Sequence, residues 1–531
     1  MRRRCISGSF LCLLGMHRIE VDAFQKSLAT RLPVFRTRSR AFGAEKDAIK
    51  YDIHTQEELD EYIAETNDRF RKRKGGKIDY PARLKACNVQ GDTQKIGSPD
   101  FPSLTHPVVR LLHQRRKSGI KDDGFKVALS IEGGGMRGCL SAGMVSALYY
   151  LGLEDAVDVV YGSSAGGVIG SYFVTRQLQW FGPEIYYDSL TTAGKEFIDA
   201  KRLMRALGLG VLNPRLWYDF ITKPHFGSPV LDLNFLLKRT LQETKPLDWE
   251  EFVCQQSKLP IKIVASNLRD EKAVVMDMEN RSFTSLSELA QCMHASCLLP
   301  GIAGPLMNRD VLTGKMRVGN NLKNVMPMAD ALLYEPMPFR SAIAEGATHV
   351  VVLRTRPDGT DVTGKSSIFE RMIFRRFFKR KNNLPRILDY MNKGLHKMLY
   401  ARDVLALNEM ANDFDRVYTD TTKPHVLTVA VPPGSPEVAR LEARRSVIFD
   451  GVRRGFARAY DALVEDPAER GRGEVVARQY FPDEILEYDP MTVCSTHKSA
   501  FEVYLETKGE DPKKWKVSAP YMMNIERATK R

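Results

Sequence analysis

The sequence predicts an α/β fold with three layers, α/β/α, in which helices cover both faces of a mostly parallel central sheet. From residue 125 to 357, short apolar segments alternate with glycine-containing turns and amphipathic helical stretches. The apolar segments are near-continuous runs of Val and Ile, which are typical of parallel strands buried on both faces. Strands that alternate with helices favour a layered α/β architecture. Helical extensions are expected at both ends of this region.

The expected strands follow one another along this region. The four strongest candidates are "KVALSI" (126–131), "VDVVYG" (157–162), "IKIVAS" (261–266) and "THVVVLRT" (348–355), and a weaker one is "KAVVMDM" (272–278). Beyond them, residues 385–410 are expected to be helical, and "HVLTVAV" (425–431) is a further strand candidate. Residues 435–465 are expected to form a pair of helices.

The composition and charge limit the kinds of molecule that this protein is expected to bind. The chain has 531 residues with 43% hydrophobic residues, enough for a large core, and a formal net charge of +14. This excess suits an anionic membrane surface, nucleic acid or an anionic substrate. The sequence has neither the basic and aromatic pattern of an RNA-binding strand nor zinc-finger spacing, so we expect no nucleic-acid partner. It also lacks the run of about 18 apolar residues that a membrane-spanning helix needs.

The cysteines and the N-terminal residues bear on the compartment. The 8 cysteines are scattered without a CxxC pair, which argues against a disulfide framework or a metal site. The segment 1–17 has a basic start and a short apolar centre, and residues 23–42 are rich in Arg and Ser without acids. The second pattern is typical of organelle transit peptides, and a simple basic extension is the alternative. A plastid, a mitochondrion or a membrane-associated place in the cytoplasm all stay open.

A nucleophile elbow is predicted at Gly162-Ser163-Ser164-Ala165-Gly166. This G-x-S-x-G motif follows a strand and precedes a helix, which is the context that the motif requires. Gly162 and Gly166 would remove Cβ atoms from a sharp turn, and Ser164 Oγ would then lie at the N-terminus of a helix. The alternative is a small-residue turn between a strand and a tightly packed helix.

A glycine-rich loop, "EGGGMRG" at residues 132–138, follows the first strand. Acyl transfer to a serine creates an oxyanion that needs preorganised backbone N–H donors, and consecutive glycines supply amides without side chains. A phosphate-binding loop is the alternative, but the GK[ST] ending is missing. A dinucleotide-binding site would also want an acid at the end of the next strand, where the elbow stands instead.

The two motifs together resemble the patatin-like phospholipase family of serine lipid acyl hydrolases, over roughly residues 125–357. Further marks of the resemblance are "CMHASCLLPGIAGP" (292–305) and the segment 329–355. The resemblance implies a Ser–Asp dyad, with Ser164 as the nucleophile and Asp330 as the general base and acid. The sequence departs from the family pattern at Ala331, where Gly is usual, and at Glu132, where Asp is usual.

The remaining predicted site residues form the oxyanion hole. They are Gly133, Gly134, Gly135, Arg137 and Gly138. Arg137 has an alternative role, which is to pair with a carboxylate or to steady the loop. The resemblance implies neither a metal nor another cofactor.

Two histidines offer a triad as the mechanistic alternative to the dyad. Ser164, Asp330 and His349 occur in the chain order of an α/β-hydrolase triad. His349 opens a predicted strand and His294 lies in a predicted helix, so both are expected to be structural. Cys292 and Cys297 lack nearby metal-ligand partners and are expected to pack as small hydrophobic residues.

The predicted function is that of a lipid acyl hydrolase of the phospholipase A, galactolipase or acylglycerol lipase type, acting through an acyl-serine intermediate. The alternative is a catalytically silent lipid-binding or scaffold protein with the same fold. The lipid substrate implies contact with a membrane surface, and an anionic one suits the basic, Phe-containing segment 366–383. The alternative for this segment is a solvated linker whose aromatic residues pack on the body. The oligomeric state stays open.

The chain is predicted to divide into six parts. They are a targeting or disordered leader (1–45), a helical N-terminal extension (46–120), the patatin-like catalytic domain (121–360), a basic and aromatic linker (361–384), a helical part that packs on the catalytic domain (385–480) and a tail (481–531).

Overall fold

The computed structural model describes residues 105–199, 229–317, 324–411, 414–492 and 497–518, together with Leu84. The predicted leader lies outside the described residues, and so does the predicted N-terminal extension up to residue 104, apart from Leu84.

The described strands form one nine-stranded sheet with the order β6-β5-β7-β3-β2-β1-β8-β9, in which β4 also pairs with β3. The strands are β1 (Val127–Ile131), β2 (Val159–Ser163), β3 (Ile261–Asn267), β4 (Lys272–Met276), β5 (Met307–Asp310), β6 (Met316–Arg317), β7 (Val325–Ala329), β8 (His349–Leu353) and β9 (His425–Val429). The predicted strands correspond to β1, β2, β3, β4, β8 and β9.

The centre of the sheet is parallel, and one side of it is antiparallel. Strands β3, β2, β1, β8 and β9 run in the same direction. Strands β4 and β7 pair with β3 in the antiparallel direction, and β5 and β6 continue the antiparallel arrangement. The α/β fold is confirmed, and the parallel arrangement that was expected holds for the strands that form its centre.

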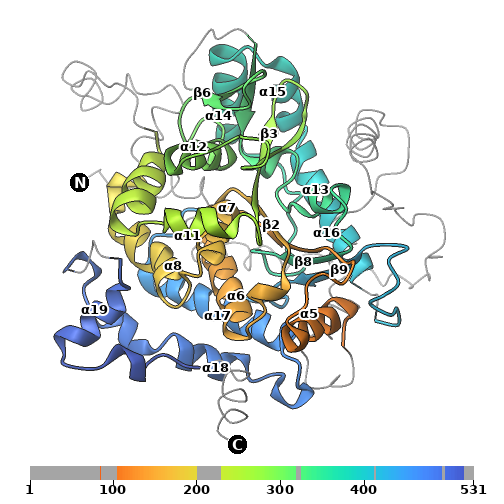
Figure 1. Ribbon diagram of the computed structural model, residues 1–531. Coiled ribbons are helices and arrows are strands. Elements are labelled where there is room, and N and C mark those ends of the chain that lie inside the picture. Colours follow the sequence, from red (N-terminus) through yellow and green to blue (C-terminus); the bar gives the residue numbers. More distant parts are fainter. Residues whose placement is uncertain are drawn as a thin grey trace, which may run out of the picture.

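Helices cover both faces of this sheet. On one face lie α6 (Gly138–Tyr150), α7 (Ala165–Val174) and α17 (Arg445–Leu463), and on the other lie α13 (Phe339–Ala344) and α16 (Leu395–Met410), as Figure 1 shows. The side chains of β1 alternate accordingly: Leu129 and Ile131 belong to the first core and Ala128 to the second. Both faces of the central strands are therefore buried, as their continuous apolar sequence predicts.

The other described helices surround these layers. They are α5 (Pro107–Ser118), α8 (Phe181–Glu184), α11 (Trp249–Gln255), α12 (Leu286–Cys297), α14 (Ile368–Phe374), α15 (Pro385–Asn392), α18 (Gly473–Tyr480) and α19 (Ala500–Thr507). Helix α8 continues into π-helical turns at Ile185–Leu190. Two further π-helical segments are Phe235–Thr244 and Arg375–Lys381. Short 3₁₀ turns occur at Gly135–Arg137 and Ala331–Leu333.

The C-terminal part of the chain is built into the same body as the predicted catalytic domain. Strand β9 extends the sheet beside β8, and α17 packs along α6 (Figure 1). A Cβ atom at Gly143 would lie 1.9 Å from the carbonyl oxygen of Val452, and one at Gly455 would lie 2.0 Å from that of Leu140. Glycine on each helix therefore permits the close backbone approach of α6 and α17.

Candidate functional site

Ser164 occupies a strained turn between β2 and α7. Its backbone has φ 53° and ψ −123°, a conformation that is costly for a residue other than glycine and is often found at functional sites. The flanking glycines permit the turn. A Cβ atom at Gly162 would lie 2.5 Å from Gly167 Cα, and one at Gly166 would lie 2.1 Å from the carbonyl oxygen of Ile131. This geometry is that of a nucleophile elbow.

Asp330 lies directly beside this serine. The Ser164 hydroxyl donates to Asp330 Oδ2 at 3.3 Å. The other carboxylate oxygen, Oδ1, accepts a hydrogen bond from the Leu332 amide at 2.8 Å, and the Asp330 amide donates to the Leu298 carbonyl at 3.1 Å. Each carboxylate oxygen of Asp330 thus has its own donor, and only Oδ2 faces the Ser164 hydroxyl. The backbone of Asp330 is fixed separately through Leu298.

The departure from the family pattern at Ala331 is accommodated by the backbone. Ala331 begins the 3₁₀ turn after Asp330, and its backbone φ is negative. A left-handed conformation would have favoured glycine there. Because φ is negative, the alanine side chain is compatible with the turn and is buried.

Burial sets the basicity of this carboxylate. Asp330 is 3% exposed, and its burial raises the pKa to about 6, although the Leu332 N–H, Arg440 and the Ser164 hydroxyl all favour the charged form. The raised pKa makes Asp330 a better base than an exposed carboxylate while leaving it largely ionised at neutral pH.

The glycine loop after β1 is tied down by Glu132. The buried Glu132 carboxylate accepts hydrogen bonds from the Thr355 amide at 2.5 Å and from the Tyr400 hydroxyl at 2.8 Å. These contacts join the loop to the end of β8 and to α16. At the next residue, a Cβ atom on Gly133 would lie 2.4 Å from the Ser163 carbonyl oxygen and 2.6 Å from Ser164 Cβ. Glycine therefore allows the loop to touch the elbow.

Three consecutive amides of this loop have no partner in the part of the chain that the structure describes. The N–H groups of Gly133, Gly134 and Gly135 donate to none of these residues, and all three glycines are partly exposed. By contrast, the amide of Met136 donates to the Arg440 carbonyl at 2.9 Å. Available amides beside a serine hydroxyl are the donors that an oxyanion requires.

The last two residues of the predicted oxyanion hole use their amides elsewhere. The Arg137 amide donates to the Gly134 carbonyl, and the Gly138 amide donates to the carbonyls of Gly135 and Met136. The Arg137 guanidinium donates to the Val438 carbonyl at 2.8 Å and pairs with Glu437 at 2.9 Å. Arg137 therefore steadies the loop against the C-terminal part, and its direct contact with an oxyanion stays a prediction.

The C-terminus of α12 contributes two residues that the sequence analysis did not place in the site. The Ser164 amide donates to Ser296 Oγ at 2.7 Å, and Ser296 Oγ donates to the Val264 carbonyl. The neighbouring Cys297 thiol is buried, and burial raises its pKa to about 12, although the nearby Ser164 hydroxyl opposes the rise. Both residues fall inside the "CMHASC" segment, which marked the family resemblance without indicating a role. Cys292 is also buried, and both cysteines are free thiols.

The two histidines of the alternative triad make no hydrogen bond to Ser164 or Asp330 among the described residues. His349 pairs in register with Val127 at the start of β1, whereas Ser164 follows the end of β2. Because these strands are parallel, the two residues lie at opposite edges of the sheet. His349 stacks on His425 at 4.8 Å between ring centroids. His294 lies on α12, where burial lowers its pKa.

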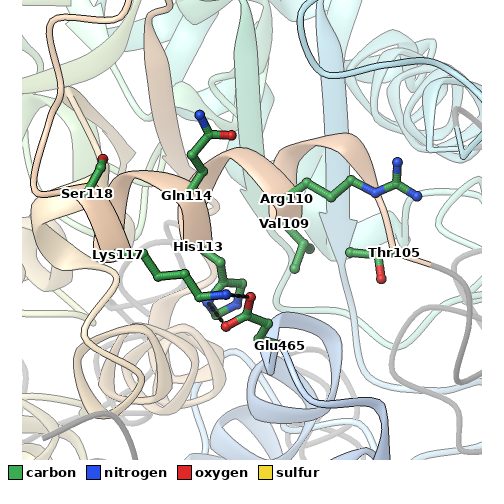
Figure 2. Close-up of a pocket in the computed structure, with 8 residues that line it drawn as sticks. All are labelled: Thr105, Val109, Arg110, His113, Gln114, Lys117, Ser118 and Glu465. Carbon is green, nitrogen blue, oxygen red and sulfur yellow. Dashed lines mark hydrogen bonds and ion pairs between the residues drawn. The ribbon is translucent and has the colours of Figure 1, made fainter. Parts of the chain in front are cut away.

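A separate cavity of about 580 Å³ lies along α5, and Figure 2 shows the side chains around it. His113 and Lys117 point toward Glu465 there, and burial lowers the pKa of His113 to about 4. None of the lining residues is one of the predicted site residues. The lining residues are Thr105, Val109, Arg110, His113, Gln114, Lys117, Ser118 and Glu465.

Metal-binding clusters and membrane-spanning helices are both absent from the described ranges of the chain. No group of His, Cys, Asp or Glu side chains there could hold a metal ion. In the same residues, no helix is both long enough and apolar enough to span a bilayer.

The α/β fold thus places a strained serine, Ser164, beside the buried carboxylate of Asp330 at one edge of the sheet. Residues 129–343 match the family model described as patatin-like phospholipase, which confirms the resemblance predicted from the sequence.

Comparison with solved structures finds the crystal structure of VipD from Legionella pneumophila, with 13% sequence identity and a TM-score of 0.27. The alignment covers 64% of this chain and 66% of VipD, slightly less than two thirds of that chain. A search of curated proteins finds no match.

Proposed function

We propose that this protein is a lipid acyl hydrolase that cleaves fatty acyl esters through Ser164 and Asp330. The observation that carries the proposal is the 3.3 Å contact between the Ser164 hydroxyl and Asp330 Oδ2. The unpartnered amides of the glycine loop and the raised pKa of Asp330 support it. Phospholipids, galactolipids and acylglycerols all contain the ester that this chemistry would cleave.

The proposed reaction proceeds in two halves. Asp330 accepts the proton of the Ser164 hydroxyl while Oγ attacks the ester carbonyl, and the amides of Gly133, Gly134 and Gly135 hold the resulting oxyanion. The intermediate collapses to an acyl-serine, and protonated Asp330 donates its proton to the departing alcohol. A water molecule then attacks the acyl-serine, Asp330 accepts its proton and returns it to Ser164 Oγ, and the fatty acid is released.

Labelling with a fluorophosphonate probe tests this proposal. We expect the wild type to be labelled and to release fatty acid from a panel of lipid classes, and Ser164→Ala to lose both properties. The matched control is Ser163→Ala, because the neighbouring Ser163 hydroxyl donates instead to the Glu335 carbonyl at 3.0 Å. Labelling of Ser164→Ala at the wild-type level would contradict the assignment. Absence of both labelling and hydrolysis in the wild type would favour the lipid-binding or scaffold alternative.

We further propose that the exposed face of α14 and the following π-helical turns docks on an anionic membrane surface. Ile368 and Met372 are 67% and 38% exposed. The exposed basic residues Arg371, Arg375 and Lys379 follow at helical spacing on the same face. Basic residues around a small apolar surface suit a peripheral contact with anionic lipid.

The Phe side chains of this segment do not all contribute to such a contact. Phe377 and Phe378 are buried against the body, so shallow insertion of these two rings into a membrane is not supported. The segment packs beside the loop that follows α12, because a Cβ atom at Gly301 would lie 2.5 Å from Ile373 Cγ2. A membrane held by α14 would therefore lie near the loop that carries the Leu298 contact to Asp330.

Charge reversal tests the membrane proposal. Each basic residue near an anionic surface contributes about 1 kcal/mol, so Arg375→Glu/Lys379→Glu is expected to weaken binding to phosphatidylglycerol-containing vesicles by at least about tenfold. Binding is measured by co-sedimentation. The control Lys513→Glu/Lys514→Glu changes the net charge equally at another exposed site. Equal binding of the two double variants would contradict a specific role for α14.

A further inference from the structure

Three arginines, Arg137, Arg356 and Arg440, lie beside the glycine loop, and two of them share one carboxylate. Glu437 Oε1 pairs with Arg137 at 2.9 Å and with Arg356 at 3.3 Å. Arg440 donates no side-chain hydrogen bond and forms no ion pair with any residue that the structure describes. This corner of the site therefore holds an arginine whose guanidinium has no partner within the described fold.

Arg440 lies against the loop that supplies the unpartnered amides. Its carbonyl accepts a hydrogen bond from the Met136 amide at 2.9 Å. A Cβ atom at Gly135 would lie 2.7 Å from the same carbonyl oxygen and 3.0 Å from Arg440 Cγ. Arg440 also favours the charged form of Asp330 and so lowers its pKa, although it forms no ion pair with it. The positive charge is therefore close to the reacting groups and is not bonded to them.

This arrangement is unfavourable for the protein alone. Burial and the neighbouring Arg356 both lower the pKa of Arg440, although Asp330 opposes the change. A partly buried charge without a hydrogen-bonded partner costs stability. Local features that cost stability without a compensating contact are expected at functional sites, and a guanidinium offers a fork of donors suited to a phosphate group.

We propose that Arg440 binds the phosphate of the substrate's head group, so that the protein prefers acyl esters that carry a phosphodiester over uncharged glycerides and galactolipids. The proposal rests on the proposed lipid acyl hydrolase function and adds a specificity-determining residue to it. Arg440 lies outside residues 129–343, the segment that matches the family. The C-terminal part of the chain would thus supply the head-group contact, and the family segment would supply the reacting groups.

The test compares two substrates that differ in phosphate. The hydrolysis of phosphatidylcholine and of diacylglycerol with the same acyl chains is measured in the same neutral-detergent micelles. Phosphatidylcholine has no net charge, so general attraction to the interface is not varied. A charge-assisted hydrogen bond is typically worth about 1.5–3 kcal/mol. We therefore expect Arg440→Gln to lower kcat/KM for phosphatidylcholine about 10- to 100-fold, through KM, and to affect diacylglycerol at least tenfold less.

Two further variants make this comparison specific. Arg440→Lys keeps the charge without the fork and is expected to be intermediate on phosphatidylcholine. Arg444→Gln removes an equal charge from a residue that pairs with Glu442 at 2.8 Å, and is expected to resemble the wild type. An equal loss on both substrates in Arg440→Gln would overturn the proposal, because it would place the effect at the reacting atoms or in the fold. An unchanged kcat/KM for phosphatidylcholine would also overturn it.

A binding measurement separates this proposal from the proposed function. Calorimetry with glycerophosphocholine, which has no acyl ester, is expected to show binding to the wild type and to Ser164→Ala, with at least tenfold weaker binding to Arg440→Gln. Inorganic phosphate is titrated in parallel, and equally tight binding of it would indicate a free-anion site and overturn the head-group assignment. If lipid hydrolysis fails while this Arg440-dependent binding persists, the proposed function is wrong and the head-group site stands. If hydrolysis depends on Ser164 and no Arg440-dependent binding occurs, the proposed function stands and the head-group site is overturned.

Discussion

Replacement of Asp330 by Asn is expected to lower kcat for ester hydrolysis by about 10²- to 10⁴-fold, the contribution typical of a general base. Asparagine has nearly the same shape as aspartate, and its side-chain oxygen can still accept the Leu332 amide that now donates to Oδ1 at 2.8 Å. The side-chain amide cannot accept the proton of the Ser164 hydroxyl. The loss should therefore appear in turnover and not in folding, which steady-state kinetics and thermal unfolding measure on the same samples.

The pH dependence of the wild type provides the control for this variant. Burial raises the pKa of Asp330 to about 6, and only the ionised carboxylate can act as the base. We therefore expect kcat/KM of the wild type to fall as the pH drops through about 6, and the residual activity of Asp330→Asn to lack this decrease. The same acidic limb in Asp330→Asn would show that another group is the base.

Replacement of Gly133 by Ala is expected to lower kcat/KM by about 10²- to 10³-fold, the effect typical of losing one oxyanion donor. The added Cβ atom would lie 2.4 Å from the Ser163 carbonyl oxygen and 2.6 Å from Ser164 Cβ. These atoms belong to the backbone and to the elbow itself, so the loop must move away from the serine. Its amides would then no longer face the developing charge.

The matched control is Gly364→Ala, because a Cβ atom at Gly364 meets no atom within 4 Å and its φ is not in the left-handed region. We expect this variant to keep wild-type kinetics. The labelling rate with a fluorophosphonate measures the chemistry at Ser164 independently of lipid presentation. Wild-type rates in Gly133→Ala would show that the loop amides do not stabilise the reaction.

The sequence was informative where local pattern and topology agree. Continuous apolar runs identified the central strands because both of their faces are buried. The glycine loop follows β1 and Ser164 follows β2, and neighbouring parallel strands bring such segments to the same edge of the sheet. The proximity of the two motifs could therefore be expected from their order in the chain.

Three strands of the antiparallel side, β5, β6 and β7, were not predicted, for a physical reason. Strand β5 reads Met-Asn-Arg-Asp, β6 has two residues, and β7 contains Pro327. Such short segments have little hydrophobic periodicity, and they form because neighbouring strands offer backbone hydrogen bonds. Asp330 directly follows β7, so its position depends on a strand that local pattern did not reveal.

Contacts between segments that are distant in the chain could not be predicted from the local sequence pattern either. Ser296 meets Ser164 across 132 residues of sequence, and Arg440 meets the glycine loop from the C-terminal part. In the basic segment, composition left open whether the aromatic residues are exposed or packed on the body, and tertiary packing buries Phe377 and Phe378 and leaves Ile368 and Met372 exposed. The rest of the fold, against which this segment packs, determines which of its faces is buried.

The glycine-mediated contact between α6 and α17, together with β9, has a consequence for how much of the chain the folded body needs. The family signature, meaning the segment 129–343 that matches the family model, ends within α13. It therefore excludes β8 and β9, which complete one side of the sheet. A chain shortened to that signature would leave one edge of β1 unpaired and one flank of α6 bare. The segment that matches the family model is therefore smaller than the body that folds, and the C-terminal strand β9 and helix α17 are needed to complete the sheet and the layer that covers it.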